Sequence, residues 1–295
     1  MTVSLRGAMT ALVTPFTPDG QVDEAALAAL VEWQIAEGIH GLVPVGSTGE
    51  AVTLSLAERE RIVRIVAEVA DGRVPVIAGA GSNDTAAAIE TSLVLGRAGA
   101  THLLHVSPMY NKPPQRGIIA HFTAIADASP VPVVLYNVPG RTGSNMTAET
   151  TLALAEHGHI CAVKEASGNT GQIDAILRGR PEGFAVLSGD DGLTLAVMAA
   201  GGDGVISVIA NVVPKLCAQL TDALATSDLA TASLIHHRLA PLVDAAFIES
   251  NPIPIKAALA MMGKMQNVLR LPLVTLEAKH EARISAALRI AGVLL

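Results

Sequence analysis

The amino-acid sequence predicts a (β/α)8 barrel followed by a small helical domain. Short runs that are apolar throughout alternate with longer, alanine-rich helical patterns from the start of the chain to about residue 225. Eight strand–helix units fit into this stretch, which is the number that closes such a barrel. The alternation then stops. We therefore expect a catalytic barrel domain over residues 1–225 and a C-terminal helical domain over residues 226–295.

The predicted strands are short and have no polar face, which is typical of a parallel sheet covered on both sides. In chain order they are 8–13, 41–45, 74–78, 102–106, 132–136, 160–164, 184–188 and 204–208. Helical patterns lie between them, among them 23–37, 57–70 and 84–98. Asp23 and Asp84 stand at the start of two of these helices, where a carboxylate can accept hydrogen bonds from free backbone N–H groups. After the barrel, three more helices are expected over 227–248, 253–263 and 275–291.

A doubly wound nucleotide-binding fold is the alternative to the barrel. Residues 78–84 read AGAGSND and hold two glycines, but they lack the third glycine of the dinucleotide fingerprint. They also follow the third predicted strand, whereas the fingerprint follows the first. We interpret this segment as a tight turn before a helix.

Composition and charge argue against several classes of function. The net charge of −7 and the pI near 5.7, without any basic block, argue against nucleic-acid binding. No uncharged apolar run reaches the length of a membrane span, and the first residues do not read as a signal peptide. Cys161 and Cys217 form no CxxC pair, which favours reduced thiols over a disulfide. We therefore expect a soluble, cytoplasmic protein that binds neither nucleic acid nor membrane.

Metal and serine-hydrolase chemistry have little support. The nine histidines are scattered, and the pairs His157–His159 and His236–His237 have no third ligand near them in the sequence. A GxSxG nucleophile motif is absent. We predict no metal and no cofactor.

Polar residues at the ends of the predicted strands are the candidates for catalysis, because active sites of such barrels lie at the C-terminal ends of the strands. Lys164 is one of six lysines and the only one that closes an apolar strand. A low-dielectric barrel mouth disfavours an ammonium ion and favours the free amine that attacks a carbonyl. The alternatives are a lysine that extends to solvent or pairs with a carboxylate such as Glu165.

Three other strand ends carry groups of suitable chemistry. The two tyrosines of the chain, Tyr110 and Tyr136, both fall there, where a phenol can transfer protons, although each could equally pack as a structural ring. Arg141 in YNVPGRTG could bind a substrate carboxylate with two hydrogen bonds, or remain a surface residue. Ser47 and Thr48 in GLVPVGSTGE place two hydroxyls after the second strand. The loop lacks the lysine and spacing of a P-loop.

Several motifs resemble those of a known family. GLVPVGSTGE, YNVPGRTG, AVKEASGN, LSGDD and GVISV occur in the family's order and spacing, followed by NPIPIKAAL at 251–259 and LRLPL at 269–273. The chain resembles the pyruvate-dependent class I aldolases of the dihydrodipicolinate synthase and N-acetylneuraminate lyase superfamily. The resemblance extends from about residue 4 to the C-terminus. Arg141 and the late motifs favour the synthase branch, which condenses pyruvate with L-aspartate 4-semialdehyde on the way to diaminopimelate and lysine.

The resemblance implies a role for each site residue. Lys164 would form an imine with pyruvate, and Tyr136 would act beside it as general acid and base. Ser47 would link Tyr136 to Tyr110 of a neighbouring subunit in a homotetramer built as a dimer of dimers. The other implied contacts are a pyruvate carboxylate on Thr48, a semialdehyde carboxylate on Arg141, and pocket-lining backbone at Gly189 and Ile206.

Two departures from the family pattern matter. Ser47 stands where family synthases usually carry threonine, which keeps the hydroxyl and loses a methyl group. Family members that bind lysine between subunits use histidine, glutamate, asparagine and tyrosine, whereas this chain has Leu56, Arg59, Ala87, Asn83 and Met109 at the corresponding positions. Only the asparagine remains, so we expect weak inhibition by lysine.

Two other functions stay open from the sequence. A related aldolase or lyase that cleaves a sugar acid or a 4-hydroxy-2-oxo acid would use the same lysine imine. A non-catalytic barrel that senses a 2-oxo acid would not need Lys164 as a free amine.

Overall fold

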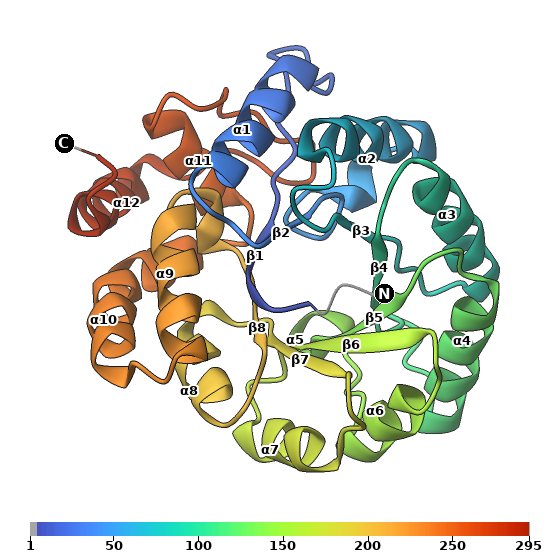
Figure 1. The fold of residues 1–295 in the computed structure, drawn as a ribbon. Coiled ribbons are helices and arrows are strands. Elements are labelled where there is room, and N and C mark those ends of the chain that lie inside the picture. The colour runs from blue at the N-terminus through green and yellow to red at the C-terminus, as the bar shows by residue number, and fades with distance from the viewer. Residues whose placement is uncertain (1–4, 295) are drawn as a thin grey trace.

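The computed structural model describes residues 5–294 and has eight parallel strands at its centre (Figure 1). The strands are β1 (Gly7–Ala11), β2 (Gly41–Val43), β3 (Ile77–Gly79), β4 (His102–Val106), β5 (Val133–Asn137), β6 (Ile160–Glu165), β7 (Ala185–Ser188) and β8 (Gly204–Ser207). They pair in the order β2-β1-β8-β7-β6-β5-β4-β3. A bridge between Leu42 and Val76 joins the two ends of this sheet, and Gly79 N–H donates to Pro44 O at 3.0 Å. The predicted barrel is confirmed.

Helices follow the strands and surround the barrel (Figure 1). They are α1 (Glu24–Ala36), α2 (Leu56–Ala70), α3 (Thr85–Arg97), α4 (Gln115–Ala128), α6 (Ala148–Ala155), α7 (Thr170–Gly179), α8 (Thr194–Ala199) and α9 (Pro214–Ala225). A single-turn helix, α5 (Pro139–Thr142), comes directly after β5. Short 3-10 turns η1 (Ala51–Thr53), η2 (Asp191–Leu193) and η3 (Ile209–Asn211) follow β2, β7 and β8.

Side chains at the helix starts explain where the helices begin. Asp23 accepts a hydrogen bond from Ala26 N–H, and Asp84 accepts one from Ala86 N–H, as predicted. Ser55 and Glu58 form a reciprocal capping box at the start of α2. Each such cap stabilises its helix by about 1 kcal/mol.

Strands β2 and β3 are shorter or shifted relative to the prediction, and proline accounts for both differences. β2 ends at Val43 because Pro44 has no N–H for the ladder and Val45 adopts a left-handed φ of 50°. β3 begins at Ile77, after Pro75, instead of at residue 74.

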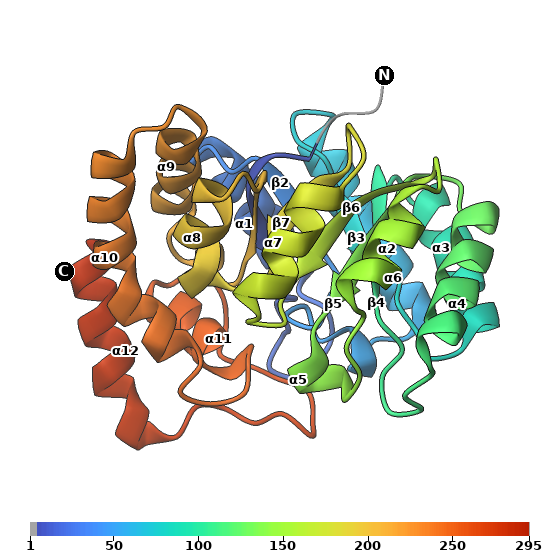
Figure 2. The same cartoon turned by 90° about the horizontal axis from the view of Figure 1, so that it is seen from below.

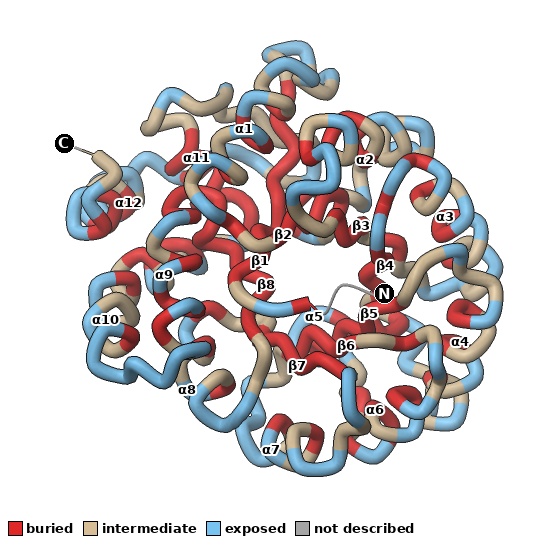
Figure 3. The backbone as a smooth tube through the Cα atoms, in the orientation of Figure 1, coloured by how far each residue is buried: buried red, intermediate tan, exposed pale blue. Residues whose placement is uncertain are grey.

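Burial follows the barrel geometry (Figure 3). The strands are buried, and the outer helices expose only the faces that point to solvent. Inward-facing apolar side chains fill the barrel: Met9, Val43, Ile77, Leu104, Val134, Ala162, Leu187 and Ile206. This packing makes the interior a core rather than a channel and gives the site above it a rigid floor.

The chain ends in three helices, α10 (Leu229–Ala246), α11 (Ile253–Met261) and α12 (Ala278–Ala291), close to the predicted ranges. Figure 2 shows α10 and α12 along the side of the barrel, with α11 and the segment after it at the end where α5 lies. Apolar residues of these helices belong to the same buried cluster as α1, α2 and α9. The division at residues 225 and 226 stays a prediction.

Three further features bear on the earlier expectations. Cys161 and Cys217 are both free thiols. Within the described part of the chain, no helix is long and apolar enough to cross a membrane. Over the same residues, no group of three or more His, Cys, Asp or Glu side chains is arranged to hold a metal ion.

Candidate active site

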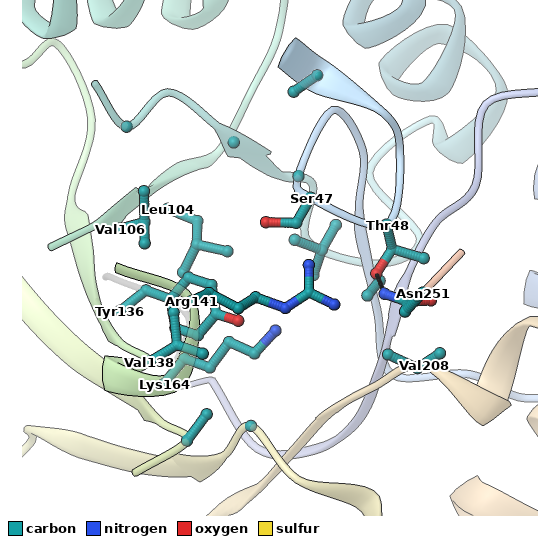
Figure 4. Close-up of a pocket in the computed structure, with 18 of the residues that line it drawn as sticks. Ser47, Thr48, Leu104, Val106, Tyr136, Val138, Arg141, Lys164, Val208 and Asn251 are labelled. Carbon is teal, nitrogen blue, oxygen red and sulfur yellow. Dashed lines mark hydrogen bonds between the residues drawn. The ribbon is translucent and has the colours of Figure 1, made fainter. Parts of the chain in front are cut away.

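A pocket of about 310 Å³ opens at the C-terminal ends of the strands (Figure 4). Its lining brings together segments that are far apart in the sequence: the loop after β2, the ends of β5 and β6, helix α5, and the start of the segment that leads into α11. Six of the eight predicted site residues line it: Ser47, Thr48, Tyr136, Arg141, Lys164 and Gly189.

Lys164 lies in the wall of this pocket with only 6% of its surface exposed. It pairs in register with Tyr136 across β5 and β6, so both side chains point into the barrel mouth. The Lys164 Nζ atom lies 4.3 Å from the centroid of the Tyr136 ring. The amine and the phenol ring, which carry the chemical groups used in imine formation and its proton transfers, are thus held side by side in one pocket.

Glu165, the carboxylate next to Lys164 in the sequence, points to a different environment. It accepts hydrogen bonds from Asn137 Nδ2, Ser167 N–H and Gln172 Nε2, and it is 1% exposed. Among residues 5–294, no ion pair joins it to Lys164. The burial of Lys164 also disagrees with a side chain that extends to solvent. Both structural interpretations of this lysine therefore fit poorly.

The loop after β2 presents its two hydroxyls differently. Ser47 is exposed and points its hydroxyl into the pocket (Figure 4). Thr48 is 5% exposed, and its Oγ1 accepts a hydrogen bond of 2.8 Å from Asn251 Nδ2. One hydroxyl is therefore free to move, and the other is fixed in orientation.

Arg141 enters the pocket from α5. Pro139 occupies the first position of this helix and Gly143 ends it with a φ of 76°, so the turn is tightly defined. Figure 4 shows the guanidinium extended into the pocket, on the side to which Lys164 Nζ points. A second arginine, Arg59, also lines the pocket, and Asp190 is the one carboxylate among the described lining residues, so the arginines favour anionic ligands.

Gly189 leaves room for the lysine. A Cβ atom at this position would lie 2.7 Å from Ala166 Cβ and 3.0 Å from Lys164 Cε, both closer than normal packing permits. A larger residue at the end of β7 would therefore push Lys164 out of place.

The other two predicted site residues do not line the pocket. Tyr110 does not line the pocket; its side chain is 89% exposed and its φ is 70°, in the left-handed region. Ile206 is fully buried in the barrel interior and likewise does not line the pocket. The single chain thus brings Lys164, Tyr136 and the hydroxyls of Ser47 and Thr48 together in one pocket. Tyr110 lies outside this pocket.

Two further polar residues near strand ends have structural partners. Asp191 accepts hydrogen bonds from the N–H groups of Val208 and Ile209 and so fixes the turn after β8. Burial raises the pKa of this carboxyl, against the hydrogen bonds that act to lower it. Ser207 Oγ accepts from Ala210 N–H within the same turn.

Comparison with models of known protein families identifies the family of this chain. The model of the dihydrodipicolinate synthetase family matches residues 4–291. The chain belongs to this family.

Relatives and solved structures of the dihydrodipicolinate synthetase family match over nearly the whole length. The 4-hydroxy-tetrahydrodipicolinate synthase of Maridesulfovibrio salexigens is 47% identical, over 99% of this chain and 100% of the relative. The chloride-inhibited dihydrodipicolinate synthase from Acinetobacter baumannii, solved in complex with pyruvate, is 40% identical with a TM-score of 0.96, covering 98% of this chain and 99% of that one. The synthase of Cyanidioschyzon merolae, solved with lysine bound, is 42% identical with a TM-score of 0.94, covering 98% and 99%.

The positions that resemble the family's lysine site carry no acidic side chain in this chain. Arg59 and Met109 line the pocket, and Asn83 Nδ2 donates to Met109 O at 3.2 Å. Ala87 offers no group for a lysine ammonium, which loses several kcal/mol when it is buried unpaired. We expect little inhibition by lysine at sub-millimolar concentration, measured in a coupled assay at fixed pyruvate. Strong inhibition in that range would contradict this prediction.

Sequence reasoning missed three residues that support the site. Asn251 contacts Thr48, and Lys256 forms a buried ion pair with Glu50 at 2.6 Å, although Glu50 and Lys256 are more than 200 positions apart. A lysine within the apolar run IPIKAAL was the available signal, since an unpaired lysine is almost never fully buried. No signal identified its partner.

Proposed function

We propose that this chain is a lyase that condenses pyruvate with L-aspartate 4-semialdehyde in diaminopimelate and lysine biosynthesis. The observation that carries the proposal is the meeting of a buried lysine, a tyrosine and an arginine in one pocket. Full-length relatives named as this synthase support it.

The proposed chemistry begins at Lys164. Its free amine adds to the C2 carbonyl of pyruvate, and water leaves as the imine forms. Tyr136 supplies and removes the protons of these steps, since its ring is next to the amine. Loss of a C3 proton gives an enamine, whose C3 attacks the aldehyde carbon of the second substrate. Attack by the amino group of that substrate on the imine carbon then closes the ring and releases Lys164.

Two elements would recognise the substrate carboxylates: helix α5 and the loop after β2 that carries Ser47 and Thr48, called here the hydroxyl loop. Thr48 would hold the pyruvate carboxylate through its hydroxyl and its backbone N–H. Arg141 would bind the semialdehyde carboxylate with two parallel hydrogen bonds. Gly189 supports the geometry by leaving space beside Lys164. Ile206 would act only through its backbone, from a position below the pocket.

The site would be completed by a second copy of the chain. Tyr110 is exposed and lies outside its own pocket, which supports its proposed donation to a neighbour, where Ser47 would link it to Tyr136. We propose a homotetramer made of two tight dimers. A cytoplasmic location agrees with the two free thiols.

The test of this function is turnover of the two substrates by the purified chain. Arg141→Ala should lower kcat/KM for the semialdehyde by about 100-fold, because a bidentate pair with a carboxylate is lost. Formation of the pyruvate imine, trapped with borohydride, should change little. Arg116, on α4 and outside the lining residues, gives the matched control Arg116→Ala.

Sugar acids and 4-hydroxy-2-oxo acids serve as competing substrates in the same assay. If the unmodified chain cleaved one of them and did not use the semialdehyde, the proposed function would be wrong. Unchanged semialdehyde kinetics in Arg141→Ala would remove Arg141 from its proposed role.

A further inference from the structure

The hydroxyl loop is held from the C-terminal segment of the chain rather than by the barrel alone. Asn251, which precedes α11, donates to Thr48 Oγ1 at 2.8 Å, and Figure 4 shows the two side chains in contact at the edge of the pocket. Two residues further along the loop, Glu50 is bound by Lys256 of α11 at 2.6 Å. The backbone N–H of Arg270 donates to the second oxygen of Glu50 at 3.1 Å.

The anchor at Glu50 is rigid because both of its side chains are buried and held by several contacts. Both side chains of the Glu50–Lys256 pair have 0% exposure. Lys256 Nζ also donates to Thr14 O at 2.9 Å and lies 4.3 Å from the centroid of the Phe16 ring. Glu50 itself has a φ of 55°, which a residue other than glycine adopts only where its surroundings enforce it. The loop therefore has little freedom beyond Thr48.

The direction of the Asn251–Thr48 hydrogen bond has a chemical consequence. A hydroxyl has one hydrogen to donate and two lone pairs to accept with. Because Asn251 Nδ2 is the donor, Thr48 Oγ1 accepts and its own hydrogen remains for another acceptor. A hydroxyl that accepts one hydrogen bond also becomes a better donor of the next. Thr48 is thereby prepared to donate to a carboxylate in the pocket.

Structure alone does not account for an asparagine here. Asn251 is 7% exposed and lines the pocket, yet its Oδ1 is buried and makes no hydrogen bond to any residue between 5 and 294. A buried acceptor left without a partner is destabilising. Stability would therefore favour a residue without that acceptor, whereas orientation of Thr48 requires the amide donor.

We infer that Asn251 is a positioning residue that turns the Thr48 hydroxyl toward the pyruvate carboxylate, with the Glu50–Lys256 pair holding the loop in place. This inference rests on the proposed function. It extends the site to the C-terminal helices, which become part of the pyruvate-binding machinery without touching the reacting atoms. Asn251 acts only through Thr48, so its effect must disappear when the Thr48 hydroxyl is removed.

A double-mutant cycle with the full-length chain tests this dependence. The variants are Thr48→Val, Asn251→Ala and the two combined, and the readouts are KM for pyruvate, kcat, KM for the semialdehyde and the thermal unfolding midpoint. Asn251→Ala should raise the pyruvate KM by about 10-fold, as expected for one hydrogen bond to a charged group, while kcat changes less than twofold. The combined variant should match Thr48→Val within twofold.

Asn251→Asp is a second test, because the side chain keeps its size and loses its amide donor. A carboxylate at this position accepts the Thr48 hydrogen instead of donating, and it repels a bound carboxylate. Its pyruvate KM should exceed that of Asn251→Ala. Arg180→Met is the stability control: Arg180 bonds Phe184 O and Gly201 O on the opposite face of the barrel, so its loss should lower the unfolding midpoint and leave the pyruvate KM unchanged.

The possible outcomes distinguish a failure of this inference from a failure of the proposed function. An unchanged pyruvate KM in Asn251→Ala and Asn251→Asp, or multiplicative effects in the combined variant, would overturn the inference while the proposed function stands. An unmodified chain that yields no borohydride-trapped pyruvate adduct would overturn the proposed function, and the inference with it.

Discussion

Lys164→Ala is expected to lower kcat by at least about 1,000-fold, because removal of a covalent nucleophile leaves only binding and electrostatic effects. The substitution should also abolish the pyruvate adduct that borohydride traps, as read by mass spectrometry of the intact chain. Little destabilisation is expected, since Lys164 makes no ion pair with any residue between 5 and 294 and lines a pocket rather than filling the core.

Lys215→Ala is the matched control for this experiment. Lys215 is exposed on α9 and does not line the pocket at the barrel mouth. Its loss should leave turnover and adduct formation unchanged. A trapped adduct that persists in Lys164→Ala would show that another amine is the nucleophile, and the assignment of the imine to the end of β6 would then be wrong.

The barrel could be predicted from the sequence because its signals are local. Each strand is a short run that is apolar on both faces, and each is followed by a helical pattern. Some of these helices begin at recognisable caps, such as Asp23 and Asp84. The errors also have a local cause. Pro44 and Pro75 lie in apolar runs that look like strand, and their missing N–H groups shorten or shift the ladder there.

Some residues of the active site could likewise be predicted from the sequence, and others could not. Lys164, Tyr136 and Arg141 could be placed because strand ends in a parallel barrel share one face, so position along the chain determines position in space. Asn251 and Lys256 could not, because their partners Thr48 and Glu50 are separated from them by 203 and 206 positions. The sequence marks Lys256 as unusual within an apolar helix, but pairing across that separation is decided only by the packing of the C-terminal helices on the barrel.

The buried ion pair of Glu50 and Lys256 should contribute strongly to the stability of the fold around the hydroxyl loop. Lys256→Met is expected to lower the free energy of unfolding by about 3–5 kcal/mol in urea denaturation, because it leaves Glu50 charged and buried without its partner. Burial lowers the pKa of Lys256 to about 8, while the charge of Glu50 acts to raise it, so the Lys256 amine is mostly protonated at pH 7. The single variant Glu50→Gln should be similarly destabilised, since it leaves the ammonium unpaired.

The combined variant Glu50→Gln with Lys256→Met distinguishes a paired charge from simple packing. With both charges removed, neither is buried alone, so the loss should be smaller than the sum of the two single losses. The exposed pair of Arg61 and Glu24 is the control, and Arg61→Ala should leave the unfolding curve unchanged because solvent screens it. Additive losses in the combined variant would mean that Glu50 and Lys256 stabilise the fold independently. The hydroxyl loop would then be held by its shape and not by the ion pair.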